Sequence, residues 1–274
     1  MDSTLVKGLT VLEWLARQPR PCGVSEAARA LGLARSNAHR TLQTLVACGF
    51  AQQNPETSAY RPSLRLFELG SLVGAAADTT LLVRPHLARL ASATGETIHL
   101  AQLDGADIVY LDKFDSPLPV AAYSRVGGRA PACCVASGKA ALAAHHPSVA
   151  DLRALFGRLH AHTPNSITDF DRLHAELART AERGYAENRE EWRLGVCGLG
   201  APVFDARGEP VAAVGMSVPS MRFARAHARA LARELLACAR DASQALGYRV
   251  GGSERDEPSA RAAGLLTRRH DEAA

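Results

Sequence analysis

The sequence predicts an α+β fold in two parts, a small helical module at the N-terminus and a larger domain built on an antiparallel sheet. Apolar residues recur at helical spacing between residues 5 and 45, and the pattern changes to short strand-like runs from Thr97 onward. The later strands and helices do not alternate regularly, which favours an antiparallel sheet over a doubly wound parallel one. A chain of 274 residues is long enough for about two domains.

The composition indicates a soluble globular protein. Hydrophobic residues make up 47% of the chain and charged residues 22%, which excludes a largely disordered or fibrous protein. No apolar window is long enough to cross a membrane, and no secretory signal opens the chain, so we expect a cytoplasmic protein without a membrane partner. The six cysteines lack Cys-x-x-Cys spacing, so no disulfide scaffold, metal site or cofactor is expected.

Three helices are expected first. Leucines at helical spacing place a helix over Leu5–Leu15, which Pro19 and Pro21 end. A short helix follows with Ser25 as its N-cap and Gly32 at its end, and a longer one runs from after Leu33 to Gly49 with an apolar stripe. Together they predict a compact helical unit.

A two-stranded wing is expected next. The segment 50–62 contains two short polar-apolar runs around a turn at Asn54, Pro55 and Glu56. Helix, short helix, tight turn, helix and hairpin within residues 1–63 are typical of a winged helix-turn-helix module. Any small helical domain remains the alternative.

The third helix carries a polar face suited to DNA. Arginine can bond guanine edges or phosphate, while Asn and Gln can pair with adenine. Residues 1–62 hold seven Lys and Arg and four Asp and Glu, hence a net charge of +3 out of +4 for the chain. The candidate DNA-binding residues are Arg35, Ser36, Asn37, Arg40, Gln43, Thr44 and, in the wing, Arg61.

Residues 64–94 are expected to form two helices that link the domains and contribute to dimerisation, with Pro85 early in the second, where a missing N–H is tolerated. Core packing alone accounts equally well for the leucines of these helices. The larger domain is expected over 95–250, followed by a disordered polar tail over 251–274. The expected strands of the larger domain are 97–103, 108–113, 120–124, 185–188, 196–205 and 211–218. Its expected helices are 137–145, 149–159, 170–183 and 224–246.

The order of these parts and several strings resemble the IclR family of bacterial transcriptional regulators. The resemblance covers residues 4–248, and the ordered combination of strings is more specific than any one of them. The strings are Leu31–Ser36, His39–Leu45, Gly128–Pro131, Ala136–Ala140, Arg183–Ala186 and Ala201–Asp205 followed by Gly208.

The resemblance implies a homodimer or a dimer of dimers whose winged helices bind an operator in double-stranded DNA. It also implies GAF-like C-terminal domains that hold a small organic acid, aromatic or not, as effector. The implied effector residues are Ala136, Ser137, Glu187, Cys197 and Ser217, with Arg129 as the most available cation and with Tyr123, Arg125 and Trp192 as weaker candidates.

These roles have plain structural alternatives. Ser137 at a helix start either offers N–H groups to a carboxylate or is an ordinary helix cap. For Cys197 the pattern favours a plain buried thiol over a ligand contact. Two departures from the family pattern matter. Cys133 and Cys134 stand where larger residues are usual, which leaves open whether they contact the ligand. Ala34 stands where a capping Ser is common, at an expected cost of about 1 kcal/mol at the start of the helix.

Two other functions compete. Ten histidines together with Cys133, Cys134 and Glu187 supply possible nucleophiles and bases for an enzyme. However, no nucleophile elbow, zinc-protease, dinucleotide or phosphate-loop motif occurs, so no catalytic residue is expected. A structural DNA-binding protein without a ligand would leave the larger domain without a role.

Overall fold

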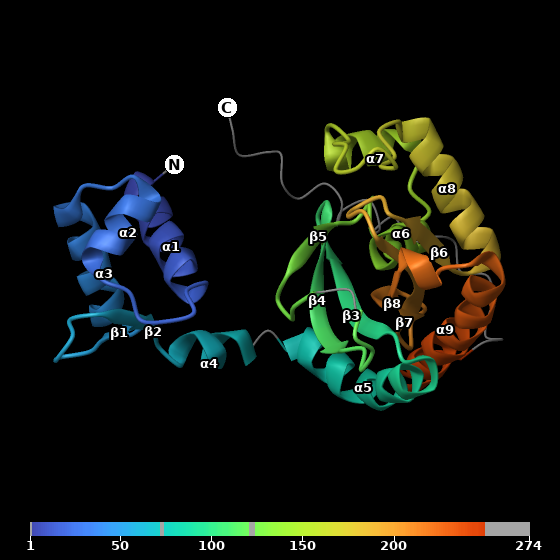
Figure 1. The fold of residues 1–274 in the computed structure, drawn as a ribbon, viewed down its shortest axis with the longest axis horizontal. Helices are drawn as coiled ribbons and strands as arrows, with labels where there is room; N and C mark the ends of the chain where they lie inside the picture. The colour runs from blue at the N-terminus through green and yellow to red at the C-terminus, as the bar shows by residue number, and fades with distance from the viewer. Residues whose placement is uncertain (1, 72–73, 121–123, 250–274) are drawn as a thin grey trace. The chain divides into compact units, whose positions relative to one another are not determined.

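The computed structural model describes residues 2–71, 74–120 and 124–249, which fall into two compact units, 1–77 and 78–274 (Figure 1). The expected tail and the expected strand residues 121–123 lie outside the described residues. Each unit has its own hydrophobic core and is described by itself.

The N-terminal unit is a winged helix-turn-helix, as predicted. Its elements are α1 (Ser3–Ala16), α2 (Val24–Leu31), α3 (Arg35–Ala47), β1 (Ala51–Gln53), β2 (Tyr60–Pro62) and α4 (Arg65–Ser71). The two strands pair antiparallel across the predicted turn. One hydrophobic core joins the helices to the wing and holds the wing against them. It contains Val11 and Leu15 of α1, Leu42 and Leu45 of α3, and Tyr60 of the wing.

The start of α2 differs from the prediction. Ser25 lies inside the helix, and Gly23 is the N-cap. Glu26 accepts a hydrogen bond from the Gly23 N–H at 2.8 Å, so a carboxylate from the first turn takes over the role predicted for a serine hydroxyl.

The C-terminal unit is built on a six-stranded antiparallel sheet in the order β5-β4-β3-β8-β7-β6. The strands are β3 (Thr97–Asp104), β4 (Asp107–Phe114), β5 (Arg129–Pro131), β6 (Ala186–Arg189), β7 (Val196–Phe204) and β8 (Pro210–Pro219). β5 is a strand that the prediction missed. Val120 and Ser124, the ends of the strand predicted there, are not in a strand.

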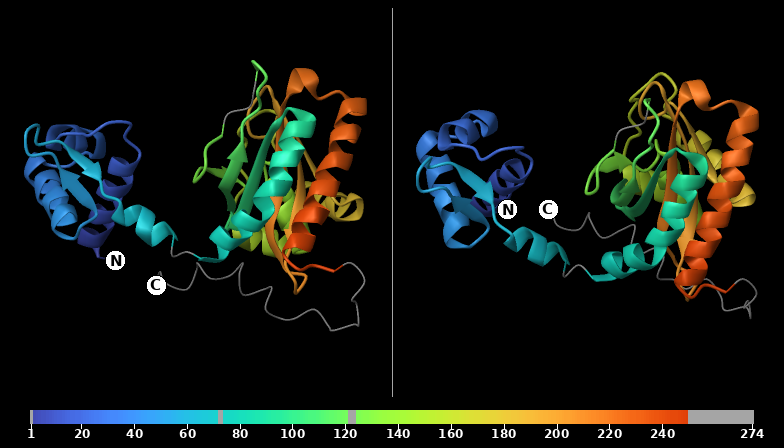
Figure 2. Two further views of the ribbon diagram at one scale, coloured as in Figure 1. Left: turned by 90° about the horizontal axis from the view of Figure 1, so that it is seen from below. Right: turned by 60° about the horizontal axis from the view of Figure 1, so that its bottom comes forward.

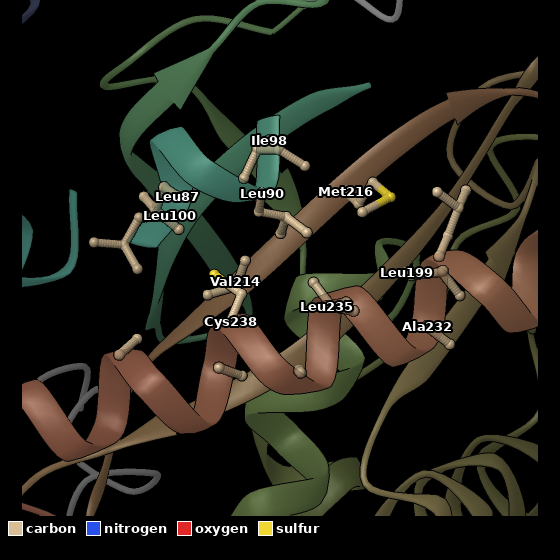
Figure 3. Close-up of a cluster of buried hydrophobic side chains, with 14 of the residues drawn as sticks. Leu87, Leu90, Ile98, Leu100, Leu199, Val214, Met216, Ala232, Leu235 and Cys238 are labelled. Atoms are coloured by element: carbon tan, nitrogen blue, oxygen red, sulfur yellow. The ribbon is translucent and has the colours of Figure 1, made fainter. Parts of the chain in front are cut away.

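Helices α5 (Gly74–Thr94) and α9 (Arg225–Ala245) cover one face of this sheet and lie side by side (Figure 2). Their apolar stripes, which include Leu87 and Leu235, pack on inward side chains of the central strands, among them Leu199 and Val214 (Figure 3). Pro85 lies in the interior of α5, not near its start as predicted, because the helix begins eleven residues earlier, at Gly74.

The other face carries α6 (Ala136–Ala144), α7 (Val149–Phe156) and α8 (Phe170–Arg183). α6 lies directly on the strands because glycines replace side chains beneath it. A Cβ at position 200 would lie 2.3 Å from the carbonyl oxygen of Ala136, and one at position 215 would lie 3.2 Å from the Cβ of Ser137. These glycines bring the N-terminus of α6 onto the centre of the sheet.

Candidate functional site

Helix α3 buries the predicted apolar stripe and exposes a polar surface. Ala38, Leu42 and Leu45 are buried, while Arg35, Ser36, Arg40 and Thr44 are exposed. Ala34 is the N-cap and makes no side-chain cap, in line with the expectation from its identity. The first N–H groups of α3 therefore have no capping side chain and point along the helix axis, where a phosphate group binds well.

The positive charge of this surface is not neutralised by neighbouring carboxylates. Arg40 donates to the amide oxygen of Asn37 at 3.0 Å, and Arg61 of the wing donates to that of Gln52 at 3.0 Å. Glu13 of α1 instead pairs with Arg17, which directly follows that helix. Glu26 of α2 pairs with Arg20, which lies in the segment before α2. Among the described residues, α3 and the wing thus present cations whose partners are neutral.

Gln43 differs from the other predicted DNA-binding residues. Its amide nitrogen donates to the Tyr60 hydroxyl at 2.8 Å and to the Gln53 side chain at 3.0 Å. Both partners belong to the wing, so Gln43 joins α3 to the hairpin. Spacing on the helix could not reveal this, because the wing residues that Gln43 meets are ten and seventeen positions away.

A cavity of about 270 Å³ opens at the N-terminus of α6 in the C-terminal unit. Strands β3, β7 and β8 form its floor, and the segments around residues 124–130 and 188–196 form its sides. The polar and aromatic residues that line it are His99, Tyr110, Ser124, Arg125, Arg129, Ser137, Asn188, Trp192, Arg193 and Ser217.

The floor of the cavity is polar but uncharged. His99 is 2% exposed, its Nε2 lies 2.7 Å from the Ser124 hydroxyl, and its ring packs on Tyr110 with centroids 4.8 Å apart. Burial, with a smaller contribution from the Lys113 ammonium, lowers the pKa of His99 to about 4. The imidazole is therefore neutral at neutral pH. Burial also raises the pKa of the Tyr110 phenol, which stays protonated.

The charges at the cavity are positive. Arg125, Arg129 and Arg193 line it, and none of the described lining residues is Asp or Glu. Arg129, predicted to be the most available cation, is already bound. Its guanidinium lies 2.7 Å from the Asp104 carboxylate and 3.2 Å from that of Asp107. Arg125 and Arg193 are exposed and have no ion-pair partner within the described parts of the chain.

The structure brings together some of the predicted effector residues and not others. Ala136, Ser137 and Ser217 line the cavity together with Arg125 and Trp192. Tyr123 lies outside the described residues. Glu187 and Cys197 are not in the lining, because they point to the opposite face of the sheet.

Strand alternation explains this difference. Glu187 pairs in register with Leu199, which belongs to the core under α9, and its carboxylate contacts Arg189 at 3.0 Å. Cys197 belongs to the same core. The next residue along β6, Asn188, faces the cavity instead. Successive residues of a strand point to opposite faces of the sheet, so a predicted position that is wrong by one residue puts the side chain on the wrong face.

Cys133 and Cys134 lie just before the cavity wall but do not line it. Both are buried, and their sulfur atoms are 3.6 Å apart. Lys139 and Glu191 are also buried, and they form an ion pair in which Nζ and Oε1 are 2.7 Å apart. This ion pair joins α6 to the segment that follows β6.

No helix among the described residues is long and apolar enough to cross a membrane. Likewise, no three His, Cys, Asp or Glu side chains in the described ranges gather as metal ligands would.

Comparison with known proteins assigns the chain to a family. The profile of the C-terminal domain of bacterial IclR transcriptional regulators matches residues 75–244, and that of the IclR helix-turn-helix domain matches residues 4–55. The chain belongs to the IclR family. It is a DNA-binding transcriptional regulator with the family's two-domain architecture.

Its relatives within the IclR family are regulators. The HTH-type transcriptional regulator XynR of Escherichia coli is 32% identical over 244 residues, which cover 88% of this chain and 96% of XynR. The crystal structure of Thermotoga maritima IclR superposes with a TM-score of 0.74 at 31% identity, covering 90% of this chain and all of that one.

An IclR homologue from Microbacterium hydrocarbonoxydans, solved in complex with 4-hydroxybenzoate, has the same fold. Its TM-score is 0.76 at 24% identity, and the match covers 89% of this chain and 99% of that one.

Proposed function

We propose that this IclR-family regulator binds a specific operator through α3 and the wing, and that a small organic acid in the cavity at α6 modulates this binding. The observation that carries the proposal is the cavity itself. It combines unpaired arginines, the N-terminus of a helix and neutral hydrogen-bonding groups, and its described lining contains no carboxylate.

An anionic ligand matches each of these groups. Val135, the N-cap of α6, makes no side-chain cap, so the first N–H groups of the helix are left for an acceptor such as a carboxylate. The helix dipole and the guanidinium groups of Arg125 and Arg193 add favourable charge. The Trp192 ring and the Tyr110 ring offer apolar surface for the body of the ligand. A homologue with the same fold was solved in complex with 4-hydroxybenzoate, which supports an aromatic hydroxy acid as one such ligand.

Calorimetric titration with 4-hydroxybenzoate, and with a panel of aromatic and aliphatic acids, tests the cavity. We expect at least one acid to bind and the variant Arg125→Ala/Arg193→Ala to weaken it at least tenfold, because two cations are lost. Arg229→Ala is the matched control, since Arg229 is an exposed arginine on α9 away from the cavity. Equal affinity in all three proteins would overturn this placement of the ligand.

For the DNA surface, the polar groups of α3 and the arginine of the wing match the major-groove and backbone contacts of helix-turn-helix proteins. Binding to the chain's own upstream DNA and to random duplex, measured over a salt series, tests the proposal. We expect Arg40→Ala and Arg61→Ala to weaken binding about 5- to 150-fold, equivalent to about 1–3 kcal/mol, and Arg17→Ala at the C-cap of α1 to leave it unchanged. Binding that does not distinguish upstream from random DNA would contradict a specific operator.

Self-association completes the proposal, as a homodimer or a dimer of dimers. Leu64, just before α4, and Phe67, in its first turn, expose 76% and 75% of their surface, and neighbouring exposed apolar side chains are typical of an interaction surface. Two linked recognition helices would read related half-sites. Sedimentation of wild type and of Phe67→Glu tests this: we expect a dimer or tetramer that Phe67→Glu weakens. A wild type that sediments as a monomer would refute it.

A further inference from the structure

A second cavity, separate from the one at the N-terminus of α6, lies at the other end of the same helix. It measures about 300 Å³ and is enclosed by the end of α6, the end of α8, strand β7 and the last part of α9. Nothing in the proposed operator or effector functions uses it. We propose that it is a second binding site, for a small molecule with an apolar body and an acidic head.

The wall of the second cavity is apolar because small residues leave room there. Alanines from α6, α8, β7 and α9 surround the space, and larger apolar side chains close it. Phe204 and Tyr248 stack at 5.3 Å between ring centroids and form one rim. Preformed apolar concavities of this size are typical of small-molecule sites. An aromatic or branched aliphatic body of about ten to fifteen non-hydrogen atoms suits this volume.

A hydrogen-bonding group in the wall points to a ligand that is not purely apolar. Thr180 of α8 lines the cavity and is 2% exposed, and its hydroxyl has no hydrogen-bond partner among the described residues. Buried hydroxyls are nearly always bonded, and an unbonded one indicates a missing partner. A hydroxyl or carboxylate of a bound molecule would supply that partner.

Charge at the rim determines the sign of the head group. Arg240 and His146 line the cavity and are exposed, and no Asp or Glu is among the described lining residues. Arg240 has no ion-pair partner within the described ranges. A ligand carboxylate there would pair with a guanidinium that is otherwise unpaired, whereas an amine would be repelled. The site therefore favours small carboxylic acids over amines and neutral molecules.

The two cavities share α6 and β7 but no lining residue. Ala136 and Ser137 line the first, and Ala140, Ala143 and Ala144 line the second. A molecule bound at either end would contact the same rigid helix. Each site can thus be disabled without touching the other, which makes the proposal separable from the effector function.

Titration of the full chain with 6-hydroxy-2-naphthoate tests the second site. The Arg125→Ala/Arg193→Ala background weakens the first cavity, so the remaining binding reports on the second. We expect Arg240→Ala and the space-filling Ala144→Phe to weaken that binding at least fivefold. Arg233→Ala, an exposed arginine on the same helix outside both cavities, should leave it unchanged.

Thr180→Val separates a ligand role from a structural one. It removes the unbonded hydroxyl while keeping the shape of the side chain, so the Tm of the ligand-free protein should stay the same or rise. In the same protein the preference for 6-hydroxy-2-naphthoate over 2-naphthoate should fall at least threefold. The proposal is overturned if the remaining binding is absent, or if adding Ala144→Phe or Arg240→Ala to the Arg125→Ala/Arg193→Ala background leaves it as unchanged as adding Arg233→Ala does.

Discussion

At the scale of single residues, His99 shows how burial determines the state of a polar group. The imidazole is enclosed on the sheet beside Ser124 and Tyr110, and its pKa is lowered to about 4 because burial disfavours the charged form. In the unfolded chain the pKa returns to about 6.5. The unfolded state therefore binds a proton between pH 6.5 and pH 4 while the folded state does not.

This difference predicts a loss of stability in mild acid. Above pH 6.5 His99 is neutral in both the folded and the unfolded state, so it does not change the free energy of unfolding. As the pH falls to 5 the free energy of unfolding should drop by about 2 kcal/mol because of this residue, and the loss levels off below pH 4. Urea unfolding of wild type and His99→Gln at pH 7.5 and pH 5 measures it. His99→Gln should lose that part of the pH dependence, and His227→Gln, at an exposed position on α9, should keep it.

At the scale of elements, the glycines of β7 and β8 decide where α6 lies. Gly200→Ala would place a methyl group 2.3 Å from the Ala136 carbonyl oxygen and 2.5 Å from the Ser137 nitrogen. We expect it to lower the free energy of unfolding by about 1–3 kcal/mol or more and to abolish binding in the first cavity, because the helix start must shift.

Gly8→Ala in α1 is the control for that prediction, since nothing lies within 4 Å of the added methyl group. It should raise stability by about 0.5–1 kcal/mol, as alanine does at a helical glycine. Urea unfolding and ligand titration check both variants. Wild-type stability and affinity in Gly200→Ala would contradict the close approach of helix and sheet.

The join between α3 and the wing gives a second prediction at this scale. Gln43→Leu leaves the hydroxyl of the fully buried Tyr60 without its partner, which should cost about 1–3 kcal/mol. The affinity for upstream and random DNA should fall by the same factor, because the wing is loosened and no base contact is lost. Unfolding curves and binding assays measure this, with Thr10→Ala at an exposed position of α1 as control. A selective loss of upstream DNA binding would instead assign Gln43 to base recognition.

At the scale of the whole molecule, each unit contains one of the two tryptophans. Trp14 packs on the core of the N-terminal unit, and Trp192 lines the first cavity of the C-terminal unit. Because the units have separate cores, they need not unfold in one transition. The N-terminal core is the smaller, so its unit should unfold at the lower urea concentration.

Fluorescence of Trp192→Phe and of Trp14→Phe follows the two units separately. An acid that binds the first cavity should raise the midpoint reported by Trp192 and leave that reported by Trp14 unchanged at fixed protein concentration. Coincident midpoints that shift together would show that the two units unfold as one.

The sequence alone was enough to predict most helices and strands, because their periodicity and their Gly and Pro boundaries are local properties. The prediction of a winged helix-turn-helix followed by an antiparallel α+β domain is confirmed, as is the family. The two elements that were predicted wrongly, the N-cap of α2 and strand β5, also have local explanations. Glu26 replaced Ser25 in capping α2, and the three-residue β5 is too short to show a period.

Only the tertiary structure decided which side chains meet. It placed Asn188, not Glu187, at the cavity, joined Gln43 to Tyr60, and bound Arg129 to two aspartates from the neighbouring turn. Each of these depends on strand register or on partners distant in the chain, which composition and spacing do not encode. The sequence determined the kind of protein, whereas long-range packing determined its cavities, because a pocket is a space that several distant segments leave between them.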